Sequence, residues 1–180
     1  MVTRSSVSLD FQRMWSELRE EDELVPQYSA LHPRQFADFL PATILAEFDP
    51  GQGTMIVRLA GSLIRSFIGF ELTGKDLTNY VTVAYENNEM PVRLAYHDQP
   101  AGRYNEVMIN FESGLEVNCC LTALPLWGKN HQRLIATFVE PRDHVKMQTD
   151  DTAKIMPRYP DHASYIDIGA GIPDVGRHDA

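Results

Sequence analysis

Residues 58–77 read Arg-Leu-Ala-Gly-Ser-Leu-Ile-Arg-Ser-Phe-Ile-Gly-Phe-Glu-Leu-Thr-Gly-Lys-Asp-Leu, and this stretch is the part of the sequence that best indicates the fold. The alternating residues before Gly61 predict a strand that ends at that glycine. Apolar residues then fall on one side of a short helix, and Gly69 predicts its left-handed C-terminal end. Thr73 and Gly74 predict a second turn, in which Gly74 has a positive φ. This order predicts a compact lid over one face of a sheet.

The stretch resembles the segment that follows the second strand of PAS domains, and the matching residues are Phe67, Gly69, Glu71, Thr73, Gly74 and Leu77. The resemblance covers roughly residues 10–141. It is closer to stand-alone bacterial PAS proteins, in which a helix that carries a Trp precedes the strand pair. It implies a five-stranded sheet in the order 2-1-5-4-3, and it brings no catalytic residue with it.

The spacing of apolar residues divides the chain into three parts. Residues 1–24 hold an amphipathic helix, with Asp10 as its predicted N-cap. Residues 25–141 form the main domain, with a short helix after Pro33, a longer one over residues 81–97, and strands predicted over residues 44–48, 54–60, 104–111, 115–126 and 133–140. The predicted fold class is α+β, a five-stranded antiparallel sheet with helices on one face. Residues 142–180 hold few apolar residues, and we expect a flexible or loosely docked tail.

Charge and composition exclude several classes of function and of compartment. The formal net charge is −9, which argues against a nucleic-acid-binding surface because such surfaces need a basic stripe. No apolar run reaches the roughly 18 residues of a membrane span, so we expect no membrane insertion. The chain has two cysteines, which are adjacent and do not form a disulfide framework, and a reducing cytoplasm is the expected compartment.

A core of this kind can enclose a small cavity between the sheet and the helices. Alternation along the strands predicts which side chains would line it. The candidates are Leu63, Phe67, Tyr96, Val107, Ile109, Phe111, Leu134, Ala136 and Phe138. The alternative is that these residues fill an ordinary hydrophobic core, and the sequence leaves both open.

No cofactor is predicted, although an unidentified small ligand would suit the cavity. The pair Cys119-Cys120 follows Asn118, a combination known from flavin-binding light sensors, but here it lies in a predicted strand, where neighbours point to opposite faces. His97 follows the long helix, where haem-binding PAS domains place an axial histidine. A lone histidine in such a turn is usually solvated, so we expect neither haem nor flavin. Histidine and cysteine spacings predict no metal site.

Three functions remain on the sequence alone. The first is a sensory or regulatory PAS protein of bacterial signal transduction that acts on an unidentified signalling protein through protein contacts. The second is a small pocket enzyme of the isomerase type, in which Asp38 with Tyr80, Tyr85 or Tyr104 would supply a base and an oxyanion donor. The third is a structural adaptor without a ligand. We expect no enzyme and predict no catalytic residue, because the early strand pair does not suit such isomerases.

Both faces of the predicted sheet carry apolar residues, so something should cover the second face. Alternation predicts that Leu45, Ile56, Ile135 and Val139 lie opposite Phe48, Val57 and Phe138. The apolar side of the N-terminal helix is the nearest cover, from the same chain or from a neighbour. We therefore expect a homodimer, with a predicted interface of Phe11, Met14, Trp15, Leu18, Ile56 and Ile135.

Overall fold

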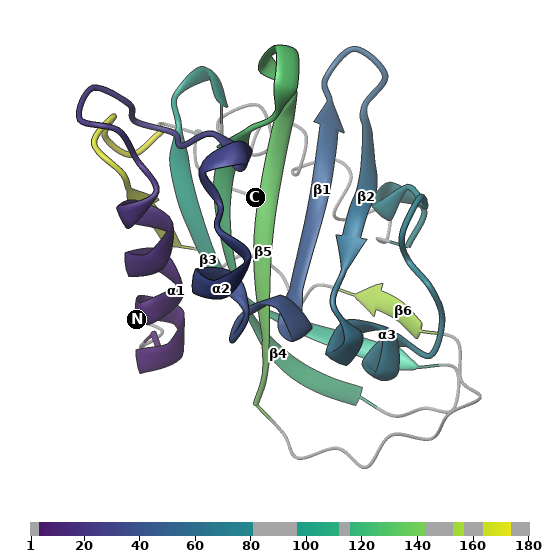
Figure 1. The fold of residues 1–180 in the computed structure, drawn as a ribbon. Helices are drawn as coiled ribbons and strands as arrows, with labels where there is room; N and C mark the ends of the chain where they lie inside the picture. Colours follow the sequence, from purple (N-terminus) through teal and green to yellow (C-terminus); the bar gives the residue numbers. More distant parts are fainter. Residues whose placement is uncertain (1–3, 81–96, 112–115, 143–152, 157–163, 174–180) are drawn as a thin grey trace, which may run out of the picture.

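The computed structural model describes residues 4–80, 97–111, 116–142, 153–156 and 164–173, and an antiparallel sheet forms its centre (Figure 1). The five main strands lie in the order β2-β1-β5-β4-β3, which confirms the predicted order. They are β1 (Thr43–Asp49), β2 (Thr54–Ala60), β3 (Ala101–Phe111), β4 (Glu116–Trp127) and β5 (Arg133–Pro141). The predicted helix over residues 81–97 lies almost wholly outside the described residues.

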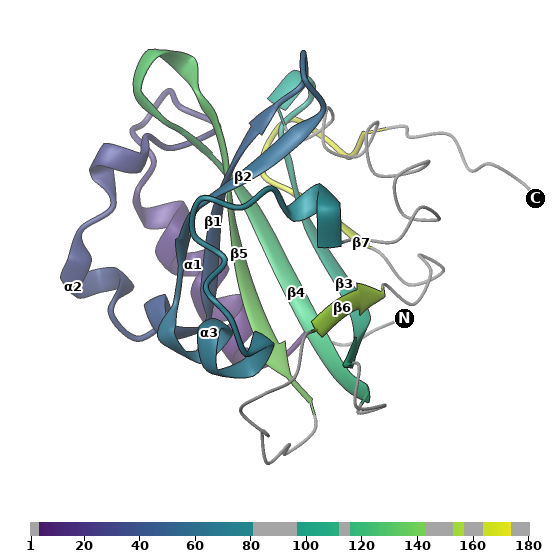
Figure 2. The same cartoon turned by 90° about the vertical axis from the view of Figure 1, so that its right-hand side faces the viewer.

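Helices cover both faces of this sheet. The described helices are α1 (Ser6–Glu17), α2 (Pro33–Phe36) and α3 (Ser62–Ile68), with shorter 3-10 turns η1 (Tyr28–Ala30), η2 (Leu40–Ala42), η3 (Leu77–Tyr80) and η4 (Lys129–His131). Helix α1 packs on the face that we call the outer face, and α3 packs on the other, the inner face (Figure 2). The amphipathic N-terminal helix and the α+β class are therefore as predicted.

Helix α1 begins five residues before its predicted first turn. The predicted N-cap Asp10 was wrong, because Ser5 caps the helix and its Oγ accepts a 3.0 Å hydrogen bond from the amide of Ser8. Ser8 is buried, and its Oγ lies 2.7 Å from Oγ1 of Thr122 on β4. Ser5 thus caps the helix, and Ser8 belongs to its packed side.

The glycines of the opening stretch take up the predicted roles. Gly69 ends α3 with φ 84°, and Gly74 has φ 83°. Gly61 is required for a different reason, since a Cβ there would lie 2.1 Å from the carbonyl oxygen of Leu40 and 2.3 Å from that of Pro41. The start of α3 therefore sits directly on the backbone of η2, and this contact brings the helix onto the inner face.

Two short strands extend the sheet beyond β3. They are β6 (Ala153–Met156), which pairs with Met108–Phe111, and β7 (Ser164–Asp167), which pairs with Ala101–Tyr104. Both come from residues 142–180, where the sequence predicted a flexible or loosely docked tail. The side chains of Ile166 and Ile168 are buried against the α1 cluster, so this part of the tail contributes to the core.

The two faces hold different apolar clusters. The outer cluster joins Phe11 and Trp15 of α1 to Leu45 and Phe138, and the inner cluster joins Phe67 of α3 to strand residues from β1 to β5. The predicted face of β5 was wrong: Ile135 and Val139 lie on the inner face with Phe48 and Val57, while Phe138 lies on the outer face with Leu45. Apolar residues occupy both faces of β5, so alternation does not fix its side, and the pairing of Leu45 with Ala136 does.

Candidate functional site

The inner face next to α3 is an apolar cluster. Phe67 packs there with Val107 and Ile109, three of the residues that the sequence predicted to line a cavity. Leu63 is exposed and takes no part in it. Tyr96 and the side chain of Phe111 lie outside what the structure describes. This end of the inner face has the character of a filled core.

The remaining predicted lining residues lie elsewhere. Leu134, Ala136 and Phe138 pack on the outer face, in the cluster of α1. The predicted set is therefore divided between the two faces of the sheet. The structure does not bring the seven described residues of this set around one space, and whether any of the nine contacts a ligand stays a prediction.

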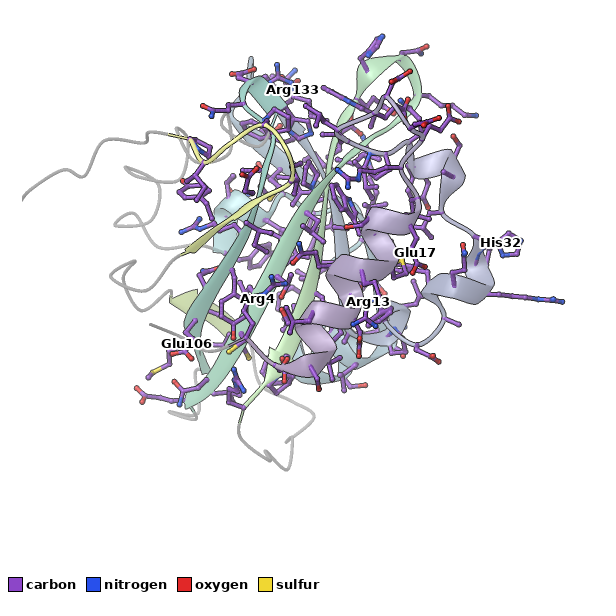
Figure 3. All side chains as sticks on the ribbon, turned by 90° about the vertical axis from the view of Figure 1, so that its left-hand side faces the viewer. Arg4, Arg13, Glu17, His32, Glu106 and Arg133 are labelled. Carbon is purple, nitrogen blue, oxygen red and sulfur yellow. The ribbon has the colours of Figure 1, made fainter. Side chains whose placement is uncertain are left out.

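The opposite end of the inner face is polar. His97, from the residues that lead into β3, is buried with its ring centroid 5.0 Å from that of Trp127. Arg133 begins β5, pairs in register with Trp127, and donates from Nη2 to Oδ1 of Asp98 at 3.1 Å. Figure 3 shows Arg133 at this end of the sheet, far from Arg4 and Glu106. Buried Arg103 and Asn105 on β3 add further polar groups.

The electrostatics at this end favour a neutral histidine. The pKa of His97 is lowered to about 4, chiefly by burial and secondly by the positive charge of Arg133. The backbone of Leu126, the Asp98 carboxylate and the backbone of Leu134 act in the opposite sense with smaller effect. Within the described part of the chain, neither ring nitrogen of His97 makes a hydrogen bond of ordinary geometry, and neither does Nη1 of Arg133.

A second polar group lies on the outer face. Cys119 and Cys120 point to opposite faces of β4, as predicted for neighbours in a strand. The Sγ of Cys120 accepts a hydrogen bond from Nε of Arg142 at 2.8 Å, and Nη2 of Arg142 donates to the hydroxyl of Tyr104 at 3.0 Å. Burial raises the pKa of Tyr104 to about 12, so its hydroxyl stays protonated.

The residues considered for an isomerase do not converge. Asp38 is exposed, Tyr104 is buried on the outer face, and Tyr80 packs near the inner cluster. Tyr85 lies outside the described residues. No group of three metal-ligating side chains occurs among the residues that the structure describes. That the chain is not an enzyme stays a prediction.

The predicted interface residues are largely internal. Phe11, Met14, Trp15 and Leu18 pack on the chain's own outer face, and Nε1 of Trp15 donates to the carbonyl of Pro125 at 2.7 Å. Ile56 is partly exposed on β2, and Ile135 is buried on the inner face. Helix α1 therefore covers its own sheet, and Val7 and Leu9 in its first turn are exposed.

Sequence reasoning missed Arg133. The residue opens an otherwise apolar strand immediately after a tight turn, and that change of character was the available signal. The sequence did single out His97, but only as a possible haem ligand, and no haem was expected. Neither the ion pair with Asp98 nor the contact with Trp127 follows from spacing, because three separate segments supply these groups.

Comparison with models of protein families gives a match. A family model described as "PAS domain" covers residues 3–138, which is more than half of the 180 residues. Among curated proteins no match is found. In the described part of the chain, no helix combines the length and the apolar composition that crossing a bilayer requires.

Proposed function

Because this chain belongs to the PAS domain family, we propose that it is a sensory or regulatory protein of bacterial signal transduction that acts through protein contacts. PAS domains serve sensory and regulatory roles in signalling and commonly mediate protein interactions. The observation that carries the proposal is the family match across residues 3–138, together with the strand order of the sheet. We also propose that the protein acts in the cytoplasm.

The proposed input is a small molecule at the inner face. One feature of this face supports a ligand: the buried polar groups of His97 and Arg133, at the end opposite the apolar cluster around Phe67. A native mass spectrum of the protein after mild purification tests this directly. The expected result is a bound mass that disappears on denaturation, and a bare protein would favour a structural adaptor without a ligand.

The proposed output is a contact surface that includes the exposed first turn of α1. A homodimer through this surface, and an unidentified signalling partner, complete the proposal. Val7 and Leu9 support it, because these two apolar side chains are 43% and 46% exposed at the start of the helix. Hydrogen exchange of the α1 amides, measured with and without the retained small molecule, tests whether input and output communicate. Unchanged exchange in α1 would contradict the coupling.

A further inference from the structure

The polar end of the inner face holds buried groups that neither the fold nor the ion pair accounts for. His97 is 8% exposed, and within the described residues neither its ring nitrogens nor Nη1 of Arg133 makes a hydrogen bond of ordinary geometry. The backbone of Leu126 and of Leu134 contacts the His97 ring only weakly. Folded proteins rarely leave buried polar atoms unpartnered, because the lost hydration is not replaced. Three such atoms on two neighbouring side chains mark this place as one where a polar group would be stabilised.

Among the described residues, one of the two terminal nitrogens of Arg133 has a partner. Its Nη2 donates to Asp98, whose side chain is 59% exposed, while Nη1 is buried. A guanidinium binds a carboxylate or phosphate best with two parallel N–H donors. Asp98 thus makes a single, solvent-exposed contact with the guanidinium of Arg133, which has further N–H donors. A small oxyanion could take both nitrogens.

We propose that Arg133 and His97 bind a small oxyanion, a carboxylate or a phosphate, which competes with the Asp98 carboxylate for the guanidinium. This inference rests on the proposed sensory function and names the class of ligand for its input. His97 contributes one N–H donor in its neutral form and two when protonated. The local positive charge is needed because a net charge of −9 disfavours anions over the protein as a whole.

The groups that face His97 support this assignment. Arg133 is close enough for its positive charge to lower the pKa of His97, and Asp98 acts weakly in the opposite sense. An anion placed beside both side chains would favour the protonated imidazole, and it would raise the pKa of His97. A raised pKa of His97 therefore distinguishes anion binding at this place from anion binding at another surface.

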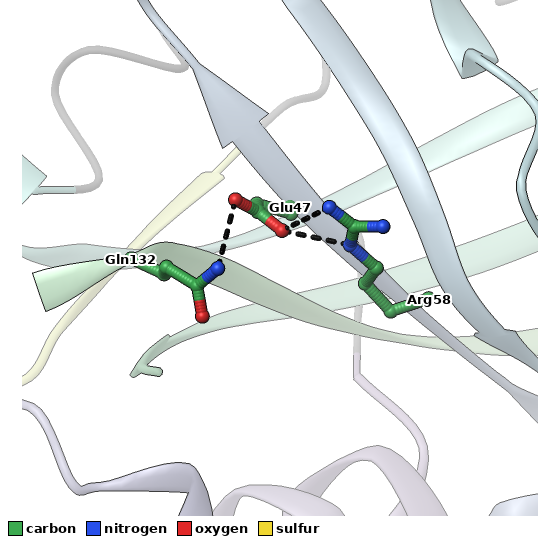
Figure 4. A network of polar contacts seen from close by, with 3 residues as sticks. All are labelled: Glu47, Arg58 and Gln132. Atoms are coloured by element: carbon green, nitrogen blue, oxygen red, sulfur yellow. Dashed lines mark hydrogen bonds and ion pairs between the residues drawn. The ribbon is translucent and has the colours of Figure 1, made fainter. Parts of the chain in front are cut away.

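Calorimetric titration with inorganic phosphate and, separately, with succinate tests the proposal, at an ionic strength held constant with NaCl. The wild type should bind at least one probe, and the better probe identifies the phosphate or the carboxylate class. Arg133→Gln should weaken binding at least about tenfold, since a charge-assisted contact is lost. Asp98→Asn should strengthen it by removing the competitor. Arg58→Gln is the control, because Arg58 also faces one carboxylate, that of Glu47, on the exposed side of β2 (Figure 4).

Imidazole NMR of His97 provides the second measurement, and saturating probe should raise its pKa by about one unit or more. The proposal is overturned if neither probe gives the wild type more binding heat, or a larger rise in the pKa of His97, than NaCl alone does. Equal binding by folded Arg133→Gln, or binding by Asp98→Asn that is no tighter than wild type, also overturns it. If Arg133→Gln does not fold, Asp98→Asn and the His97 titration decide. A protein that binds neither probe but retains another small molecule contradicts this inference and leaves the proposed function standing.

Discussion

The amide of Gly74 donates a 2.8 Å hydrogen bond to the carbonyl of Val57, and the amide of Val57 donates a 2.9 Å hydrogen bond to the carbonyl of Lys75. Val57 lies on β2, at the edge of the sheet, so the turn makes the hydrogen bonds that a further strand would make. Oδ1 of Asp76 extends the same contact by accepting from the amide of Met55 at 2.9 Å. The glycine turn therefore blocks this stretch of the edge.

Gly74→Ala tests the role of that turn. Gly74 has φ 83°, where an alanine is strained, and among the described residues no atom lies within 4 Å of the position of an added Cβ. The expected loss is therefore conformational, about 1 kcal/mol or more in the free energy of unfolding by urea. Gly51→Ala is the matched control, since Gly51 lies in a turn without a positive φ. Equal stability of the two variants would contradict the prediction.

Ile168→Ala tests whether the C-terminal segment is part of the core. Ile168 is 6% exposed in the outer cluster, and its carbonyl accepts a 2.8 Å hydrogen bond from Arg19. Truncation should lower the free energy of unfolding by about 2–5 kcal/mol. Ile172→Ala, at a position 58% exposed, should change it by less than about 0.5 kcal/mol. A small effect at both positions would show that the segment is loosely docked.

Stability should fall in mild acid because of His97. The folded pKa of about 4 lies below the ordinary 6.5, so the neutral form is favoured by folding. The stabilisation is complete above about pH 6.5, is lost progressively as the pH falls to about 4, and amounts to about 3 kcal/mol. Urea unfolding between pH 7 and pH 4 measures it. His97→Gln should flatten this dependence, whereas His131→Gln, at an exposed histidine, should leave it unchanged.

Self-association should depend on the exposed apolar residues in the first turn of α1. Sedimentation velocity of the wild type across micromolar concentrations should show a dimer. Val7→Ser with Leu9→Ser should weaken it, because these exposed side chains would lose apolar area in the interface. Leu63→Ser, at an exposed residue of α3, is the control. A wild type that stays monomeric ends the dimer proposal, and a dimer that the double variant leaves intact moves it to another surface.

Local signals in the sequence were sufficient for most of the fold. The positive φ of Gly74 and the end of α3 at Gly69 follow from residue chemistry within a few positions, and the strand order followed from the family resemblance. The side of β5 did not follow, because apolar residues occupy both of its faces and pairing with β1 decides between them. The start of α1 was missed for a related reason, since the burial of Ser8 depends on Thr122, which lies 114 residues further on.

The polar end of the inner face shows the same limit. His97, Trp127 and Arg133 are brought together by the β4–β5 pairing and by the chain that enters β3. Each residue alone has an ordinary explanation in its own segment, as a turn histidine, a hairpin aromatic and a surface cation. What distinguishes these residues from those of a solvated turn is that they lie together, with the ring of His97 and Nη1 of Arg133 buried.

The position of α1 on the outer face also determines when that helix is able to fold during synthesis. Trp15 donates to a carbonyl 110 residues later in the chain, and Arg19 to one 149 residues later. At roughly 5–20 residues per second, ribosomes need roughly 7–30 s to supply that last partner. Until β4 and β5 have been synthesised, the apolar side of α1 has no sheet to cover, and the hydrogen bond from Arg19 to Ile168 forms last.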